Sequence, residues 1–449
     1  MPILPIDSGR YGTPEMRKLF DEEERLQKLL DVEAALAWAQ SEVGDVPISD
    51  ANKIMEMAST EFVKLDRVKE IESEIQHDLM AVVQALSEAC GSSGGYVHLG
   101  ATSSDILDTA TALQLKGATG LLIDRLKHLN KILVSYVDRE KKTIIIGRTH
   151  GQHAIPTTLG FKFAVWLMEL SRHIERLREC SKRVLVGKMS GAVGTQAGFG
   201  ENGLEVQRLV MERVGLGVVE ISSQIIQRDR HAEFLCILGM IASSLDKFAT
   251  EIRQLQRPEI GELAEPFRRS SQVGSSTMPQ KRNPTRSERI GGLDKVVRSL
   301  VPPSLENIVT WHERDLTNSS CERFIIPEAC ILVDYMIESM IRILEGLEID
   351  RERMRRNVSL TQDRVMSESI MMQLVKKGMG RQEAHELIRN ISLKSESENQ
   401  PFLEALLENQ KVTSRMTKEE VEEALQPHNY LGTAIEQVDK ILASFNSVN

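Results

Sequence analysis

The sequence predicts an all-α protein, and three observations lead to this prediction. Apolar residues recur at every third or fourth position over runs of about 25–30 residues, which is the spacing of one helix face. Aromatic residues make up only 4% of the 449-residue chain, so Leu, Ile, Val, Ala and 18 methionines must form the core. No alternating series of apolar and polar residues indicates a sheet, although residues 144–146 could form a short β segment.

The expected elements follow one another in chain order. Residues 1–20 combine Pro, Gly and charge, and are predicted to form an extended arm. The segment Gly91–Gly95 is a clear break. A long helix is then expected over residues 106–137 with Asp105 as its N-cap, because a short acidic side chain accepts hydrogen bonds from free N–H groups. Helical spacing predicts further helices over residues 22–43, 73–90, 158–183, 228–257, 285–308 and 323–347.

Length and a change of pattern predict three domains. At about 150 residues per domain, this chain is long enough for three. We expect an N-terminal helical domain over residues 1–104 and a central long-helix bundle over 105–349. Shorter, more charged helices from residue 350 predict a C-terminal helical domain over 350–449. The long helices carry more apolar surface than one chain can bury, so other subunits are expected to cover it in a shared helical core.

Composition argues against several classes of partner and cofactor. The formal net charge is −9 and no long basic run occurs, which argues against nucleic acid or an acidic membrane surface as the main partner. Five scattered cysteines without a CxxC pair indicate neither a zinc site nor a disulfide framework. The N-terminus lacks a charged region followed by an apolar one, and a cytoplasmic location is expected.

The most informative segment is Gly274–Glu288, Gly-Ser-Ser-Thr-Met-Pro-Gln-Lys-Arg-Asn-Pro-Thr-Arg-Ser-Glu. Two prolines and a Gly-Ser-Ser-Thr start predict a loop that leads into a helix. Lys281 and Asn283 supply a fixed positive charge and an amide, which suit carboxylate binding. The Ser275 hydroxyl could act as a base if cationic neighbours lower its pKa. The alternative is a Gly/Ser/Pro surface linker.

A second segment, Gly147–Thr158, carries two histidines three residues apart. Metal binding would need a third ligand and a helical or turn context, whereas Gly151 and Pro156 favour a loop. A histidine on a polar loop is suited to proton donation, because its unperturbed pKa of about 6.5 lies near neutral pH. Proton donation is therefore one expectation for a histidine of this loop. A structural role in loop hydrogen bonding is the alternative for either histidine, and it is favoured more for His153 than for His150.

Two further segments are weaker signals on their own. Val97–Asp105 contains Thr102 and Ser103 and is typical of a capped helix N-terminus, which can also bind an anion. Gln76-His77-Asp78 is expected inside a helix, where a histidine is usually a surface or structural residue.

Together these segments resemble the three signature regions of the fumarase/aspartase superfamily: Thr-Ser-x-Asp, Gly-Arg-Thr-His and the Ser-Ser-x-Met-Pro loop. The sequence departs from the family pattern at two positions. Gln76 stands where an Arg commonly precedes the His-Asp pair, and Arg289 stands where an Asn is common. Within the superfamily, further features resemble the adenylosuccinate lyase family: Arg10-Tyr11, Gln76–Asp78, Ser223-Gln224, Gln227–His231, Trp311–Asp315, Ser319–Arg323, Thr413–Arg415 and Tyr430–Gly432.

The resemblance implies a β-elimination that releases fumarate from adenylosuccinate to give AMP, and from SAICAR to give AICAR. It implies Ser275 as the base in a mobile loop, assisted by Lys281, and His150 as the acid at the leaving nitrogen. Glu288 is the implied orienting partner of His150, and His77 competes for the acid role. No metal or organic cofactor is implied.

The resemblance also implies how the substrate is held. A cationic clamp would bind the phosphate, and its members are Arg10, Tyr11, Arg314, Ser319 and Arg323. Ordinary surface ion pairing with nearby carboxylates is the alternative for these arginines. The other implied contacts are Gln76, Asp78, His98, Thr102, Ser103, Gln224, Ser276, Arg282, Asn283, Arg289 and Ser320. The family architecture implies a homotetramer whose active sites are shared between subunits.

Three alternatives remain open at this point. Argininosuccinate lyase shares Gln280 of the loop but would need a guanidinium site, against which the arginine clamp argues. A cycloisomerase acting on carboxymuconate shares the Lys-Arg-Asn-Pro sequence but gives no reason for Arg10-Tyr11. A catalytically silent structural homologue would be expected to lose site residues, whereas Ser275, His150 and Lys281 are all present.

Overall fold

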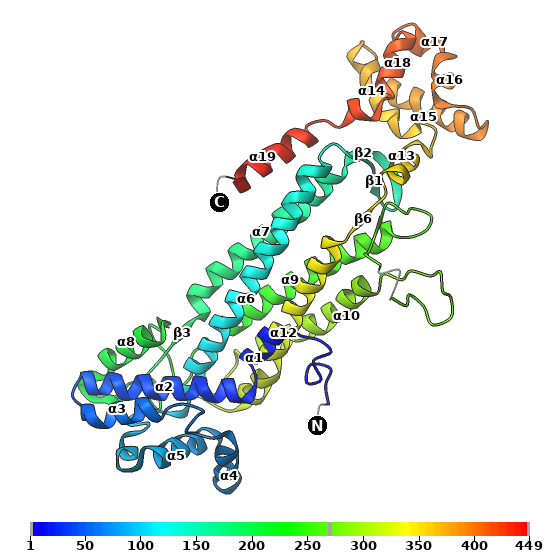
Figure 1. Cartoon of the computed structure of the whole chain (residues 1–449). Coiled ribbons are helices and arrows are strands. Elements are labelled where there is room, and N and C mark those ends of the chain that lie inside the picture. The colour runs from blue at the N-terminus through cyan, green and yellow to red at the C-terminus, as the bar shows by residue number, and fades with distance from the viewer. Residues whose placement is uncertain (1–2, 268–271, 447–449) are drawn as a thin grey trace. The chain divides into compact units, whose positions relative to one another are not determined.

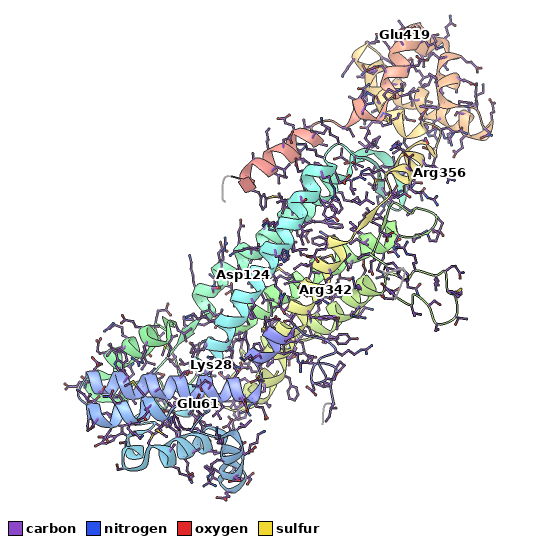
Figure 2. The ribbon with its side chains drawn as sticks, viewed as in Figure 1. Lys28, Glu61, Asp124, Arg342, Arg356 and Glu419 are labelled. Atoms are coloured by element: carbon purple, nitrogen blue, oxygen red, sulfur yellow. The ribbon has the colours of Figure 1, made fainter. Side chains whose placement is uncertain are left out.

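The computed structural model of the chain describes residues 3–267 and 272–446. Helices make up most of this part of the chain, and the strands are short and pair only in twos (Figure 1). The all-α prediction is therefore confirmed. Exposed charged side chains such as Asp124 and Glu419 project from helices, and Glu61 projects from a turn (Figure 2).

The chain forms two compact units, and each is assembled from three separate segments. The first unit comprises Met1–Lys127, Arg172–Asp246 and Ile290–Ser339. The second comprises His128–Ser171, Lys247–Arg289 and Met340–Asn449. The division into three domains in chain order stays a prediction.

The first unit begins with short helices that pack around α2 (Figure 1). Leu26, Leu30 and Leu36 of α2 are buried together with Ile54 of α3 and Leu86 of α5, as the helical spacing of these residues requires. The early helices are α1 (Pro14–Leu19), α2 (Glu22–Glu42), α3 (Ile48–Met57), α4 (Leu65–Ile75) and α5 (Asp78–Cys90), followed by the 3₁₀ turn η1 (Gly91–Tyr96). Later elements with residues in this unit are α6 (Ser103–Glu140), α7 (Leu159–Val184), β3 (Val186–Gly187), η2 (Ala197–Asn202), α8 (Gly203–Val214), β4 (Gly217–Val218), α9 (Asp229–Leu255), α10 (Thr285–Ser299), α11 (Val301–Glu306) and α12 (Thr317–Glu345).

Two expectations near the N-terminus need correction. The expected extended arm contains α1, because Thr13 caps the helix by accepting from Met16 N and Pro14 fits its first turn. The helix expected over residues 73–90 is two helices, with the chain breaking at Gln76 and His77. Gln76 adopts a left-handed conformation with φ 55°, and His77 caps α5 through its Nδ1, which accepts from Met80 N at 3.3 Å.

Two helix boundaries in the central part also differ from expectation. Helix α6 is 38 residues long, about 57 Å, and it begins at Ser103. Asp105 therefore lies within its first turn and is not the N-cap, although its carboxylate does accept from Thr102 N at 2.9 Å. The helix expected over residues 285–308 ends at Ser299, and α11 follows it. Pro302 and Pro303 explain the break, because prolines cannot donate the hydrogen bonds of a continuing helix.

The second unit contains the one hairpin of the described chain. Strands β1 (Ile144–Thr149) and β2 (Gln152–Thr158) pair antiparallel, and Thr149 faces Gln152. His150 and Gly151 both have positive φ, 52° and 75°, as a two-residue type I′ turn requires. The loop expected around His150 is thus a hairpin tip.

A small helical cluster completes the second unit. Buried residues such as Ile370, Leu374, Phe402 and Leu406 form its core. The further elements of the second unit are β5 (Leu263–Ala264), β6 (Glu348–Ile349), α13 (Arg351–Ser359), η3 (Arg364–Met366), α14 (Ser367–Lys376), α15 (Arg381–Ser397), α16 (Phe402–Leu407), α17 (Gln410–Thr413), α18 (Lys418–Ala424), η4 (Pro427–Tyr430) and α19 (Ala434–Asn446). Among the described residues, no helix is long and apolar enough to cross a membrane.

Candidate active site

The first unit contains a cavity of about 930 Å³, which we call the clamp cavity. The break between α4 and α5, the start of α6, the segment after β3 and the start of α12 form its wall. It gathers many of the side chains that the sequence singled out: Gln76, His77, Asp78, Ser103, Gln224, Arg314, Ser319, Ser320 and Arg323. Four of these sequence segments are far apart in the chain, so the fold itself brings them together.

The α4–α5 break places His77 and Asp78 in the wall of the clamp cavity. Because His77 caps α5, its ring stays at the helix end, and its Nδ1 lies 3.7 Å from Asp78 Oδ1. Arg323 of α12 donates to the other carboxylate oxygen of Asp78. Burial by itself would raise the pKa of the Asp78 carboxyl, but hydrogen bonds from Arg323 and Leu79 N hold that pKa below its ordinary value. Asp78 therefore carries a negative charge at neutral pH.

Arg314 and Gln224 form another part of the wall. Arg314 Nη1 donates to Gln224 Oε1 at 2.8 Å, and Gln224 Nε2 donates to Ala192 O at 2.8 Å. These two bonds fix the orientation of the Gln224 amide. Within the described chain, Arg314 forms no ion pair with the neighbouring Glu313 or Asp315, and Asp315 instead accepts from Trp311 N at 2.6 Å.

A buried network underlies the arginines of α12. Arg228 donates to both carboxylate oxygens of Asp108, at 2.9 and 2.8 Å, and to Glu322 at 2.8 Å. Burial opposes the charge of Glu322, but His231 and Arg228 hold the pKa of this carboxyl below its ordinary value. Because Glu322 precedes Arg323, this network fixes the helix turn that presents Arg323 to the cavity.

Eight lining residues were not selected from the sequence as site residues: Glu72, Leu107, Ala192, Val193, His312, Glu313, Asp315 and Leu316. His312 has φ 52°, which is uncommon for a residue other than glycine and typical of turns near functional sites. From the sequence, Arg314 of the same Trp311–Asp315 segment was named as a site residue, but His312 was not. Ala192 and Val193 carry no polar side chain, so the sequence gives no signal for them.

Several predicted residues of the first unit lie outside the lining of the clamp cavity. Tyr11 packs against Tyr335 with ring centroids 5.6 Å apart, and the Arg10 guanidinium lies 5.9 Å from the Tyr11 ring. His98 Nδ1 lies 2.7 Å from Oε1 of the buried Glu33. Although burial opposes its charge, the hydrogen bond with Glu33 raises the pKa of His98. Thr102 immediately precedes Ser103 at the start of α6, and substrate contacts for all four residues stay predictions.

In the second unit, the β1–β2 hairpin presents His150 at its exposed tip. Arg148 anchors the hairpin, because both of its terminal nitrogens donate at 2.8 Å to the carboxylate of the fully buried Glu262. Asn357 of α13 donates to the same carboxylate at 2.8 Å. Burial and the nearby Arg148 lower the pKa of His153, so this second histidine is neutral at pH 7.

Hydrogen bonds within the segment Gly274–Glu288, which we call the signature loop, hold its two ends together. Asn283 Nδ2 donates to Gly274 O at 2.9 Å, and a Cβ on Gly274 would lie 2.0 Å from Lys281 O, so only glycine fits there. Ser275 Oγ accepts from Thr277 N at 3.3 Å and Met278 N at 3.1 Å. Lys281 is exposed, and Ser276 Oγ lies 3.5 Å from the Thr277 hydroxyl.

The predicted site residues from Arg282 onward differ in exposure and in their interaction partners. Arg282 pairs with Glu348 at 2.5 Å and lies 5.1 Å from the ring of Phe267, so its side chain already has partners. Glu288 and Arg289 are exposed in the first turns of α10. In the described chain no hydrogen bond joins Glu288 to His150, and this pairing stays a prediction.

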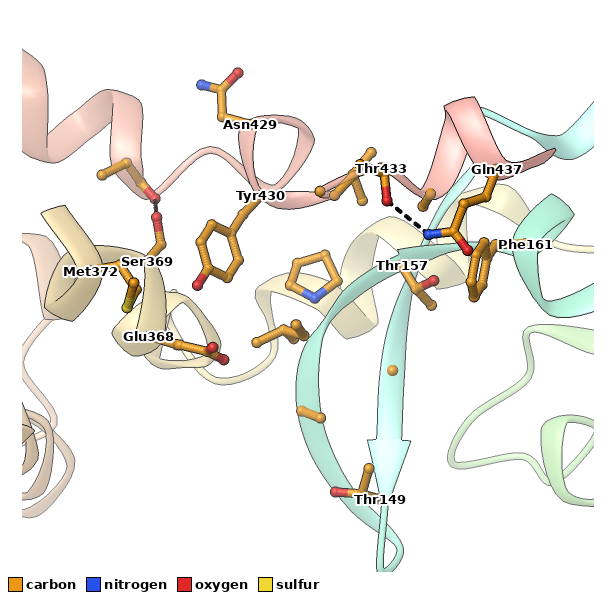
Figure 3. A pocket seen from close by; sticks show the side chains of 18 of the residues that line it. Thr149, Thr157, Phe161, Glu368, Ser369, Met372, Asn429, Tyr430, Thr433 and Gln437 are labelled. Atoms are coloured by element: carbon orange, nitrogen blue, oxygen red, sulfur yellow. Dashed lines mark hydrogen bonds between the residues drawn. The ribbon is translucent and has the colours of Figure 1, made fainter. Parts of the chain in front are cut away.

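The second unit has a larger cavity of about 1420 Å³, between the hairpin, α7, α14, α18 and α19 (Figure 3). Thr149 and Thr157 line it from the hairpin, and Tyr430 lines it from the C-terminal segment. Burial first, and then the nearby Glu368, raise the pKa of Tyr430. None of the predicted catalytic side chains lines this cavity, so size alone does not identify the site. No group of three or more His, Cys, Asp or Glu side chains within residues 3–267 and 272–446 is arranged to hold a metal ion.

Two family models match the chain. One, described as lyase, matches residues 9–298, and the other, described as adenylosuccinate lyase C-terminus, matches residues 363–441. The chain is 54% identical to adenylosuccinate lyase of Pyrococcus horikoshii over 442 residues, which cover 98% of each sequence. It is 49% identical to adenylosuccinate lyase of Methanocaldococcus jannaschii, covering 100% of this chain and 97% of the relative.

Solved structures agree on the fold. The 3-carboxy-cis,cis-muconate lactonizing enzyme of Pseudomonas putida superposes with a TM-score of 0.90 at 33% identity, covering 99% of both chains. A fumarate lyase of Mesorhizobium superposes with a TM-score of 0.90 at 32% identity, covering 98% of this chain and 100% of that one. Both are less similar in sequence than the archaeal relatives.

Proposed function

Because the chain belongs to the adenylosuccinate lyase family, we propose that it cleaves adenylosuccinate to AMP and fumarate, and SAICAR to AICAR and fumarate. The observation that supports this proposal most directly is that the chain is 54% identical to an adenylosuccinate lyase over 98% of both sequences. The reaction is a β-elimination by a carbon–nitrogen lyase. A base removes a proton from the succinyl carbon next to the C–N carbon, the C–N bond breaks, and an acid protonates the departing nitrogen.

Ser275 is the base in this proposal. Its hydroxyl needs a strongly lowered pKa, which requires donors around Oγ. The backbone N–H groups of Thr277 and Met278 already donate to that oxygen, and they support the proposal because they would stabilise the alkoxide. Lys281 and Asn283 hold the succinyl carboxylate as negative charge builds on it.

His150 is the acid that protonates the leaving nitrogen, and Glu288 orients it. The anchored hairpin supports this role, because a rigid support keeps the imidazole in a reactive position. His77 remains the competitor, since it lies in the wall of the clamp cavity beside Asp78.

The clamp cavity binds the nucleotide end of the substrate. Arg314, Ser319 and Arg323 meet the phosphate, since guanidinium groups form paired hydrogen bonds with phosphate oxygens. Gln224 and Ser103 contact the remainder of the nucleotide. Arg10 and Tyr11 belong to the same clamp by resemblance.

The protein acts as a homotetramer with active sites shared between subunits. The clamp cavity belongs to the first unit, whereas His150, Ser275 and Lys281 belong to the second. Large apolar side chains on the long helices are exposed in the single chain, among them Val165 at 51% and Phe324 at 66%. Such surface supports association, because subunit contact would bury it. We place this enzyme in the cytoplasm, without a metal or organic cofactor.

A direct assay tests the proposed function. Purified protein should cause the ultraviolet spectrum of adenylosuccinate to change as AMP and fumarate form, and both products should appear in equal amounts. The competing substrate is 3-carboxy-cis,cis-muconate, because a lactonizing enzyme shares the fold. Turnover of the muconate with no turnover of adenylosuccinate would overturn the proposal.

A further inference from the structure

A smaller cavity of about 200 Å³, which we call the recess, shares lining residues with the clamp cavity in the first unit. The shared residues are Leu107, Arg314, Ser319 and Arg323. Arg25 of α2 lines the recess but not the clamp cavity. The recess is smaller than the roughly 300–1,000 Å³ of a pocket for a whole small molecule, so it suits one group of a ligand.

Each of the three acidic side chains that line the recess forms an ion pair with a basic side chain. Asp108 and Glu322 are both bonded to Arg228, at 2.8 Å in each case. Glu22 pairs with Lys69 at 2.6 Å. These pairs leave no free carboxylate among the charged groups that line the recess.

Two guanidinium groups of the recess lack a carboxylate partner within the described chain. Arg314 donates to the neutral Gln224 amide, and the Arg25 side chain forms no hydrogen bond or ion pair with described residues. Burial lowers the pKa of Arg25, and repulsion from the nearby Arg323 guanidinium lowers it further. The carboxylates of Asp78, Glu72 and Glu22 act in the opposite direction, but none of them is hydrogen-bonded to Arg25 within the described chain, and the pKa stays below its ordinary value. A partly buried charge without a partner is costly, and an anion in the recess would remove that cost.

We propose that Arg25 is a further phosphate-binding residue, which meets the substrate phosphate in the recess together with Arg314, Ser319 and Arg323. This inference rests on the proposed function and deepens it. The α4–α5 break carries the uncharged Gln76, whose Nε2 donates to Ser73 O at 2.8 Å. Arg25 of helix α2 therefore supplies to the recess a positive charge that Gln76 at the α4–α5 break does not supply.

Arg25→Met tests the proposal, because it removes the charge and keeps most of the length of the side chain. The unliganded variant should melt at about the temperature of the wild type, since within the described chain the Arg25 side chain has no hydrogen bond or ion pair to lose. The AMP and inorganic phosphate concentrations that give half of the full thermal stabilisation should both rise about tenfold or more. Stabilisation by fumarate should be unchanged, because fumarate carries no phosphate. Arg25→Lys should give an intermediate result, because lysine keeps the charge without the paired donors.

The matched control is Lys28→Met on the same helix (Figure 2). Lys28 pairs with Glu24 at 3.0 Å and Asp31 at 3.3 Å and lines neither cavity, so its loss should leave AMP and phosphate binding unchanged. Wild-type affinity for AMP and phosphate in Arg25→Met would overturn the inference. Equal loss for fumarate and phosphate, with a lower melting temperature, would show a structural role and also overturn it.

The same experiment separates this inference from the proposed function. If the wild type does not cleave adenylosuccinate, the proposed function fails, and inorganic phosphate still reports on Arg25. If the wild type is not stabilised by either AMP or phosphate, the inference fails whatever the activity assay gives.

Discussion

Breaking the buried ion pair between Lys188 and Asp105 should destabilise the first unit strongly. Both side chains are 0% exposed, and Lys188 Nζ lies 2.5 Å from Asp105 Oδ1. Removing one partner of a buried pair costs about 3–5 kcal/mol, because the other charge remains buried without a counter-charge. The losses of stability of Lys188→Met and Asp105→Asn should lie at opposite ends of that range, because the charged group that remains buried has different hydrogen-bond partners in each variant.

Lys188→Met leaves the Asp105 carboxylate with three backbone donors. Thr102 N donates to it at 2.9 Å, Ser190 N at 2.9 Å and Gly191 N at 3.1 Å. We therefore expect a loss of about 3 kcal/mol in the free energy of unfolding. Asp105→Asn leaves the Lys188 ammonium with the Ser190 hydroxyl at 3.1 Å, and the loss should be about 5 kcal/mol.

Urea unfolding followed by circular dichroism, at one fixed protein concentration, measures these losses. The double variant Lys188→Met/Asp105→Asn removes both charges and should be more stable than Asp105→Asn alone. Its KM for adenylosuccinate should still be raised, because the Asp105 carboxylate holds Thr102 and Gly191, which directly precede the lining residues Ser103 and Ala192. If Lys188→Met unfolds within 1 kcal/mol of the wild type, the reasoning about this pair is wrong.

Three further outcomes test the site. Ser275→Ala or His150→Ala should each lower kcat by about a hundredfold or more while substrate still binds, and near-normal turnover in Ser275→Ala would remove it as the base. Arg323→Ala should weaken nucleotide binding by about 2–5 kcal/mol with fumarate inhibition nearly unchanged, whereas an equal loss for both ligands would mean a structural role. His77→Ala and Lys281→Ala, each inactive, should regain part of the activity when mixed, mildly denatured and reassembled. Mixed tetramers as inactive as their parents would contradict sites shared between subunits.

The segments that we expect to carry the chemistry can be found in the sequence, because each is a short run of residues whose order is read directly along the chain. The loop Gly274–Glu288, the segment around His150 and the start of α6 were singled out by their residue types and by their resemblance to known signature motifs, and their roles stay predictions. Helix α7, expected over residues 158–183, spans Leu159–Val184, since the apolar spacing that predicts a helix is also a local property.

Backbone conformation at the site was less accessible to sequence reasoning. Gln76 and His150 adopt positive φ, and neither is the glycine that usually signals such a conformation. The His77 segment was therefore expected within a helix, and the hairpin tip was expected to be a loop. In both cases the error concerns a turn of one or two residues, which periodicity over longer windows does not detect.

What the sequence by itself determined was the all-α class and the course of most long helices, because each depends on neighbours along the chain. Only the tertiary structure decided which charges are already neutralised. Arg228 and Asp108 are 120 residues apart in sequence, yet they form a buried pair, whereas the Arg25 guanidinium is hydrogen-bonded to no carboxylate of the described residues. Charge pairing depends on distance in space and on burial, and packing of the helices sets both.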